Sequence, residues 1–223
     1  MIAGLPWRVL QLADSAFPAG GFAHSAGLEA ASHLGEARSP ARLDGFVRAH
    51  LWNVGTASLP FVGAAHDAPR DVWALDARVD AFLTHHVANR ASRTQGRAFA
   101  ATCARVFDDP FLAALASGAR AREATAHHGP IFGAALAAIG IGRRDTLALH
   151  MYLALRGVAS AAVRLGLAGP LEAQRLQERH AATLDHVLGD CAALGPDAAA
   201  SSAPLLDVLG ATHDRLYARL FQS

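Results

Sequence analysis

The chain contains no lysine, because all 20 of its basic residues are arginines. It therefore cannot form a Schiff base, use a lysine as general base or hold a phosphate with the lysine of a P-loop. Aromatic residues make up only 7% of the sequence, and the formal net charge is +1. A charge so close to zero supplies no basic surface of the kind that attracts nucleic acid, so no nucleic-acid partner is expected.

Cysteine is also scarce, and long hydrophobic runs are absent. The two cysteines, Cys103 and Cys191, lie in apolar helical surroundings, which predicts buried free thiols rather than a disulfide framework. The longest apolar run, residues 130–141, is about 12 residues long and too short to cross a bilayer. The first residues lack the basic region and apolar core of a signal peptide. These absences predict a cytoplasmic protein that has no membrane partner.

Alanine and leucine dominate what is present, which is a helical composition. Apolar residues recur at three- and four-residue spacing, and no segment alternates with period two. The sequence predicts an all-α fold, a single domain of about ten helices forming a bundle over residues 1–195. A link of flexible composition and a C-terminal tail follow in residues 196–223. The last long helix is expected to run from Leu171 to Leu194.

The least ordinary stretch is QLADSAFPAGGFAHSAGLE, residues 11–29. Pro18 stops a short apolar segment, because proline cannot continue a helix and biases the preceding residue away from the helical conformation. Gly20 and Gly21 then permit backbone angles or close approaches that side chains block. This pattern predicts a helix, a sharp turn and a second helix, with Phe22 and Glu29 among the residues near the start of the second helix.

The sequence lacks the motifs of several common enzyme classes. The Gly-Gly pair is not followed by the GKS or GKT of a phosphate loop, and no GxSxG turn is present. His24 and Ser25 do not form a nucleophile pair on a helix, because adjacent helical residues point in different directions. The sequence therefore predicts no catalytic residue and no enzyme.

Histidine is abundant, with 12 residues. Zinc-type sites on helices usually need His residues four apart or a CxxC motif, and neither occurs with suitable partners. Adjacent histidines on a loop can still chelate, so His127 and His128 are the candidates for a weak nickel or zinc surface site. The alternative is that these histidines are solvated or cap a helix. A metal-dependent hydrolase that uses the paired histidines is a further alternative.

Three other features remain open between structural and binding roles. Arg164 ends a long helix, where it favours the helix dipole or binds a partner. Arg93 and Gln95 lie in a polar segment that interrupts the apolar pattern. They either cap a helix, face solvent or bind a partner. Tyr217 and Phe221 belong to an apolar stripe that either docks on its own domain or inserts into a partner groove.

Five motifs, found in the expected order along the chain, resemble those of one protein family. ADSAFPAGGFAHSAGLE resembles the signature of the urease accessory protein F family (UreF). ASRTQGRAF, HHGPIFGAALAAIGI and MYLALRGVASAAVRLGLAGPLEAQRL are similar to its mid-chain arginine–glycine segment, its histidine-led helix and its long helix with a following glutamine. HDRLYARLFQS resembles the closing tail. The matches cover nearly the whole length.

The resemblance implies an all-helical, non-enzymatic scaffold for the maturation of nickel urease. Members form homodimers, bind accessory protein D or H, and with it recruit and regulate the GTPase accessory protein G. The assembly acts on apo-urease, where nickel is inserted. GTP is bound by the partner GTPase and nickel is handled by the complex, so no intrinsic cofactor is implied. A helical adaptor unrelated to urease is the alternative function.

The family's motifs mark a set of partner-binding residues. These are Phe22, His24, Ser25, Glu29, Arg93, Gln95, Arg164, Gln174, Tyr217, Arg219, Leu220 and Phe221. The residues of the glycine-turn motif, at positions 22–29, are candidates for the surface that the GTPase contacts. The residues of the tail, at positions 217–221, are candidates for binding D/H. Residues 51–69 match only in their general helical pattern. Because the chain has no lysine, any role that a lysine has in the family must here fall to an arginine or be absent.

Overall fold

The structure, a computed structural model, describes residues 7–121 and 125–223, and within these ranges it is helical without a strand. The predicted all-α single domain is confirmed. The helices are α1 (Trp7–Ala13), α2 (Leu28–His33), α3 (Pro40–Ala57), α4 (Leu59–Asp67), α5 (Val72–Phe82), α6 (His86–Val106), α7 (Pro110–Ala121), α8 (His128–Ala138), α9 (Arg143–Arg164), α10 (Pro170–Arg179), α11 (Ala181–Cys191) and α12 (Pro204–Ala211). Short 3-10 turns are η1 (Gly21–Ala23), η2 (Pro69–Asp71), η3 (Pro196–Ala198) and η4 (His213–Arg215).

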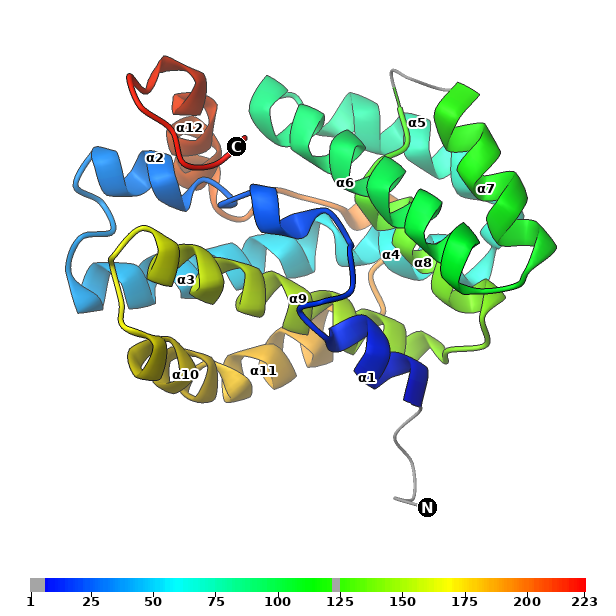
Figure 1. Cartoon of the computed structure of the whole chain (residues 1–223), viewed down its shortest axis with the longest axis horizontal. Helices are drawn as coiled ribbons and strands as arrows, with labels where there is room; N and C mark the ends of the chain where they lie inside the picture. Colours follow the sequence, from blue (N-terminus) through cyan, green and yellow to red (C-terminus); the bar gives the residue numbers. More distant parts are fainter. Residues whose placement is uncertain (1–6, 122–124) are drawn as a thin grey trace.

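Helix α8 lies at the centre of one half of the molecule, among α4, α5, α6 and α7 (Figure 1). Its residues from Gly129 to Leu136 are all buried, as its nearly continuous apolar sequence predicts. It packs most extensively on α4 and α6. Helix α8, which contains most of the longest apolar run of the sequence, is therefore part of the core.

Helix α9 connects the two halves, since it packs on α4 and α8 as well as on α3, α10 and α11. It is the one described helix long and apolar enough to cross a membrane by length and composition. However, 56% of its apolar window is buried inside the fold. This burial is the behaviour of a core helix.

At the starts of two helices the sequence places a capping residue directly before a proline. Ser39 accepts a hydrogen bond from the backbone N–H of Arg42 at 3.3 Å, with Pro40 as the first helical residue of α3. Asp109 does the same for α7, accepting from two backbone N–H groups at 2.8 and 3.1 Å. Both cysteines are buried and free, as expected, and burial raises the pKa of the Cys103 thiol to about 12.

Two interpretations of the helical pattern are wrong. The polar segment around Arg93 and Gln95 is not a break, because α6 continues through it. Its polar residues occupy one side of an amphipathic helix whose other side buries Ala91 and Phe99. The expected helix from Leu171 to Leu194 is instead two helices, α10 and α11.

His180 marks the boundary between α10 and α11. Its imidazole is 1% exposed, and its Nε2 lies 3.2 Å from a carboxylate oxygen of Asp44 on α3. No glycine or proline accompanies this break. The apolar spacing therefore gave no sign of it, since the cause is a tertiary contact.

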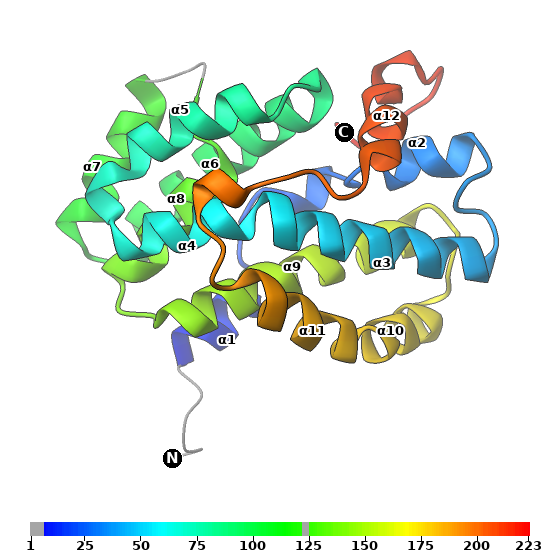
Figure 2. The same cartoon turned by 180° about the vertical axis from the view of Figure 1, so that it is seen from behind.

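The chain after α11 crosses the molecule before forming α12. Figure 2 shows this orange segment passing over α4 and α3 to reach α12. Ala200 donates its N–H to the carbonyl of Thr56 at 3.1 Å, and Ser202 donates to the Asn53 side chain at 3.0 Å. Helix α12 then packs on α2, α3 and α6, which brings the end of the chain back to the residues around position 25.

Candidate functional site

The site is built around residues 17–29, named here the elbow, which lead from α1 to α2. Phe17 is buried against Phe99, with ring centroids 6.2 Å apart, and fixes the start of the elbow on α6. Gly20 follows with φ +79°, and a Cβ there would lie 2.9 Å from the Cβ of Ala98. Gly21 has room for a side chain, so the conformational requirement belongs to Gly20.

The second helix begins later than the pattern around Phe22 predicts. Residues Gly21–Ala23 form a 3-10 turn, and the α-helical conformation begins only at Leu28, after Ala26 and Gly27 with φ values of +54° and +83°. The two successive left-handed residues turn the chain sharply. Ser25 and Glu29 thereby face the same neighbour, the C-terminal tail.

The tail, residues 212–223, docks on the elbow of its own chain. Ser25 donates both its backbone N–H and its hydroxyl to the carbonyl oxygen of Ser223, at 2.7 and 2.9 Å. Gln222 donates its N–H to the carbonyl of Ala23 at 2.8 Å. His24 Nδ1 shares a 2.6 Å hydrogen bond with the Ser223 hydroxyl. Of the two outcomes left open for the tail, docking on its own domain is the one that the structure contains.

Glu29 is the buried anchor of this docking, with 2% exposure. Its carboxylate accepts the backbone N–H groups of Leu220 at 2.6 Å and Phe221 at 3.1 Å. The fully buried His213 donates Nε2–H to the same carboxylate at 2.9 Å. A buried carboxylate is stabilised only when such donors replace its hydration, so these contacts define one position for the tail.

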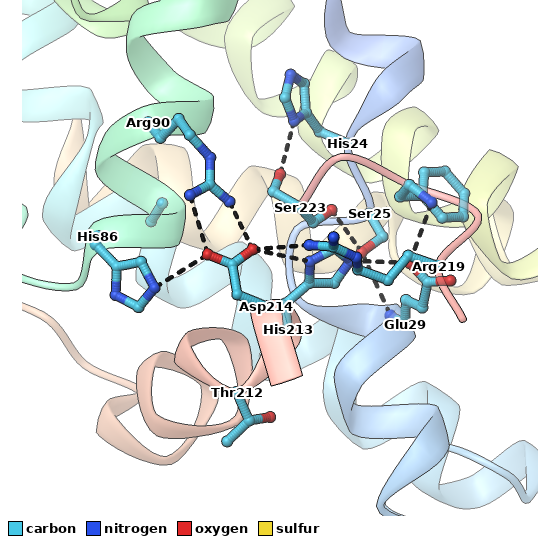
Figure 3. A network of polar contacts seen from close by, with 12 residues as sticks. His24, Ser25, Glu29, His86, Arg90, Thr212, His213, Asp214, Arg219 and Ser223 are labelled. Atoms are coloured by element: carbon cyan, nitrogen blue, oxygen red, sulfur yellow. Dashed lines mark hydrogen bonds and ion pairs between the residues drawn. The ribbon is translucent and has the colours of Figure 1, made fainter. Parts of the chain in front are cut away.

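Asp214 attaches the start of the tail to α6 at the surface. It accepts two hydrogen bonds from Arg90, at 3.0 and 2.8 Å, and others from His86 and Arg219, at 3.2 and 3.0 Å (Figure 3). The hydrogen bonds from Arg90 are the main cause of the lowered pKa of Asp214. Arg219 reaches back from further along the tail, so this cluster also folds the tail onto itself.

Arg164 joins the elbow, the end of α9 and the tail. Its guanidinium carbon lies 3.9 Å from the ring centroid of Phe22 and 4.1 Å from that of Phe221. It also donates a hydrogen bond to the carbonyl of Phe22. Phe221 is buried whereas Phe22 is 73% exposed. This double cation–π contact holds an exposed aromatic ring in a defined position.

The remaining predicted residues are spread more widely. Gln95 lies beneath the elbow, with its side-chain oxygen 3.9 Å from where a Cβ of Gly21 would be. Arg93 lies further back on α6, with a nitrogen 3.9 Å from Asp80. Gln174 is exposed on α10, outside the contacts between elbow and tail. Tyr217 is fully exposed on the tail.

His127 and His128 face different surroundings and do not converge. His127 is fully buried, donates Nε2–H to Asp80 at 3.1 Å and contacts the Ser92 hydroxyl at 3.2 Å. His128 packs among the rings of Phe99, Phe132 and His150. Across residues 7–121 and 125–223, no three His, Cys, Asp or Glu side chains are placed to share a metal ion. The predicted surface metal site is therefore not assembled by this pair, which lies in the interior.

A cavity of about 690 Å³ lies behind the elbow, between α6, α9 and the tail. Five imidazoles line it, from His24, His50, His85, His128 and His150. Burial lowers the pKa of His24, His50 and His128 to about 4 and that of His150 to about 3. These four imidazoles are neutral at pH 7. Nε2 of His24 and Nδ1 of His150 have no hydrogen-bond partner among the described residues. Neutral imidazole nitrogens of this kind accept hydrogen bonds or bind borderline metal ions.

Several residues of this site had no signal in the sequence. His213, Asp214, Arg90 and His86 join the tail to the elbow and α6, yet each is an ordinary polar residue in its local pattern. They meet only because α12 returns the chain to α2 and α6. His50 on α3 and His150 on α9 likewise lie about a hundred residues apart in the sequence, yet both line the same cavity.

Comparison with known proteins gives consistent matches. The family model described as UreF matches residues 37–181. Proteins named urease accessory protein F from Oryza sativa subsp. indica and from Arabidopsis thaliana are 37% and 36% identical, covering 96% and 98% of this chain and 84% and 93% of theirs. A protein named urease accessory protein UreF from Mycobacterium sp. (strain JLS) is 32% identical, with 96% of this chain and 97% of its own length covered.

Proposed function

The chain belongs to the urease accessory protein F family and so has a role in urease maturation, and we propose that it acts there as a nickel-delivery scaffold. In this proposal it binds accessory protein D or H, recruits and regulates the GTPase accessory protein G, and assists nickel insertion into apo-urease. The family is one of accessory proteins rather than of enzymes. A helical adaptor unrelated to urease is set aside by the family membership.

The observation that carries the proposal is the surface formed by the elbow, Arg164 and the tail. Phe22 presents 73% of its surface to solvent while Arg164 holds it from behind. An exposed aromatic ring supported by an arginine is a common centre of binding energy in protein interfaces. We assign this surface to the GTPase, because the elbow carries a motif that resembles the family's signature and presents the exposed Phe22.

A second surface suits the D/H partner. Large exposed apolar side chains gather on α2, α12 and the tail, which lie together at one end of the molecule (Figure 1). They are Leu34, Leu205, Val208, Tyr217 and Leu220. Several large apolar side chains left exposed on neighbouring elements favour a protein-binding surface. The tail contributes Tyr217 and Leu220 to this surface without leaving its place on Glu29.

The histidine-lined cavity suits nickel handling. Imidazole is a favoured ligand of Ni²⁺, and uncharged imidazoles do not repel a cation. In this proposal the cavity gives nickel a passage through the scaffold rather than a permanent site. GTP is bound by the partner, in keeping with the absence of lysine. The homodimer is proposed on the resemblance alone, and the cytoplasmic location stays the expectation drawn from the sequence.

The experiment is a binding assay by size-exclusion chromatography with the cognate D/H protein and GTPase. The wild-type chain is expected to elute with both partners in one complex. Arg164→Ala should keep D/H binding and lose the GTPase, because Phe22 is no longer held in place. Arg105→Ala, at an exposed position near the end of α6, is the matched control and should assemble as the wild type does. Absence of any joint complex under all nucleotide and nickel conditions rejects the proposal.

A further inference from the structure

A serine, a histidine and an aspartate form a hydrogen-bonded chain beside the histidine-lined cavity. They come from three neighbouring elements: Asp80 from α5, Ser92 from α6 and His127 from the turn before α8. Nδ1 of His127 lies 3.2 Å from the Ser92 hydroxyl, and Nε2 lies 3.1 Å from a carboxylate oxygen of Asp80. Ser92 and Asp80 lie 35 and 47 positions from His127 in the sequence, so no local motif predicts the arrangement.

The aspartate determines which groups in this chain donate and which accept. Its carboxylate also accepts a hydrogen bond from the Asn89 side chain at 3.1 Å, and this bond is the main cause of the lowered pKa of Asp80. Because an ionised carboxylate only accepts, the imidazole proton is assigned to Nε2. Burial lowers the pKa of His127, so the ring is neutral at pH 7 and Nδ1 is an acceptor. The Ser92 hydroxyl therefore donates its proton to Nδ1.

The chain leads from the cavity toward the surface through a buried imidazole. Ser92 lines the cavity, the His127 side chain is 0% exposed and the Asp80 side chain is 41% exposed. The Ser92 oxygen also accepts the backbone N–H of His128 at 3.2 Å, which holds the hydroxyl in one orientation. A serine that donates to a neutral imidazole supported by a carboxylate has the arrangement that activates a nucleophile.

The start of α8 provides a donor beside this serine. Gly129, the second residue of α8, lines the cavity together with Ser92, and the first N–H groups of a helix have no acceptor within it. Such a donor, at the positive end of the helix dipole, stabilises the negative oxygen that forms when a carbonyl is attacked. The α6 residues next to Ser92 in the wall, Ala88, Ala91 and Gln95, are uncharged, which suits an uncharged substrate.

We propose that Ser92, His127 and Asp80 form an acyl-transfer site that opens into the cavity and takes small uncharged esters. Ser92 Oγ attacks the ester carbonyl carbon while the hydroxyl proton moves to Nδ1 of His127. The bond from that carbon to the alcohol oxygen then breaks, and the same proton passes from Nδ1 to the departing alcohol. Water releases the acyl group from Ser92 by the same two steps. Asp80 is a positioning residue, since its charge stabilises the imidazolium that forms in between.

The test is covalent labelling of the full-length chain with phenylmethanesulfonyl fluoride, followed by mass spectrometry of the intact protein. The serine oxygen displaces fluoride from sulfur, and the hydroxyl proton leaves with it as HF. The wild-type chain is expected to gain one sulfonyl group at pH 7, which peptide mass spectrometry should place on Ser92. Ser92→Ala should lose this label. It should also lose the part of p-nitrophenyl acetate hydrolysis that the reagent abolishes in the wild type.

Ser58→Ala is the matched control, because Ser58 lines the same cavity and also contacts an imidazole. Its hydroxyl lies 2.9 Å from Nε2 of His150, but Nδ1 of that ring has no hydrogen-bond partner among the described residues, so no carboxylate supports the pair. Ser58→Ala should be labelled as fast as the wild type. Asp80→Asn keeps an acceptor oxygen but removes the charge, and should be labelled at least about tenfold more slowly. Urea denaturation verifies that each variant is folded.

No label on the wild-type chain, or a label on residues other than Ser92, overturns the site. A label on Ser92 that forms as fast in Asp80→Asn as in the wild type overturns the role of Asp80. This activity is additional to the scaffold role and needs neither nickel nor a partner protein. Its failure therefore leaves the scaffold proposal intact, whereas failure of the scaffold shows as the absence of a complex in chromatography.

Discussion

Glu29 illustrates how one buried carboxylate organises a segment that is distant in the sequence. It lies in the first turn of α2, where a negative charge is favoured by the helix dipole. It is 2% exposed and receives hydrogen bonds from His213, Leu220 and Phe221. The sequence marked Glu29 as a candidate, but for binding another protein. In the structure its donors come from its own tail.

Glu29→Gln should loosen the tail and destabilise the fold. The neutral amide keeps one acceptor oxygen but cannot accept all three hydrogen bonds, so we expect a loss of about 1–3 kcal/mol in the free energy of unfolding. Urea denaturation measures that loss, and hydrogen exchange should show faster exchange at the Leu220 and Phe221 amides. Glu36→Gln is the control, because Glu36 is half exposed and 3.7 Å from Arg42, and its effect should stay within about 0.5 kcal/mol. Equal stability of the two variants contradicts the anchoring role.

At the scale of elements, close packing between α6 and the turn before α8 positions the cavity. Gly96 is buried on α6, and a Cβ there would lie 2.0 Å from the carbonyl oxygen of Ala126. Asp76 on α5 caps the same turn by accepting the N–H groups of Ala126 at 2.9 Å and His127 at 2.5 Å. His128 follows directly and enters the cavity wall. The position of His128 in the wall of the histidine-lined cavity thus depends on how closely these elements approach.

Gly96→Ala should destabilise the protein by roughly 2 kcal/mol or more, since the added methyl group forces α6 away from the turn. Gly45→Ala is the matched control on α3, where a Cβ meets nothing within 4 Å. It should be neutral or stabilising by up to about 1 kcal/mol, because alanine is the better helix former. The midpoints of urea denaturation compare the two. If Gly96→Ala unfolds at the same urea concentration as the wild type, the close approach is not as tight as described.

Some helix boundaries can be predicted from the sequence and others cannot. Local signals located the starts of α3 and α7, because Ser39 and Asp109 cap helices through contacts within three residues. The break at His180 was missed, since it coincides with a tertiary contact to Asp44 and with no glycine or proline. The continuity of α6 was misjudged, since its polar residues belong to one side of an amphipathic helix. The elbow was found from its proline and glycines. Its partner in the fold was not, because the contact between Glu29 and His213 spans 184 positions.

At the scale of the whole molecule, buried neutral imidazoles make stability depend on pH. His50, His128 and His150 come from three helices, and burial lowers the pKa of each to about 4, 4 and 3 from an ordinary value of 6.5. Between about pH 6.5 and 4 the unfolded chain binds protons that the folded protein does not. The free energy of unfolding therefore falls as the pH is lowered through this window.

The expected loss from pH 7 to 4.5 is on the order of a few kcal/mol, seen as a lower urea midpoint. His128→Phe, which keeps a ring among Phe99 and Phe132, should reduce this slope, whereas His33→Gln at an exposed position should not. The lowered pKa values of Asp80 and Asp214 act at lower pH, below their ordinary value of 3.8. Stability that stays constant from pH 7 to 4.5 contradicts the buried, neutral state of these histidines.

In the proposed function, the elbow, Arg164 and the docked tail form one surface through which the chain supports urease maturation. The most direct measurement is urease activity in cells that express the cognate urease and the other accessory proteins but lack this chain. The wild-type chain and Arg105→Ala should restore urease activity. Arg164→Ala should restore an activity that is lower by roughly tenfold or more, as expected for loss of an interface arginine. Full restoration by Arg164→Ala, at the same protein level, contradicts the account.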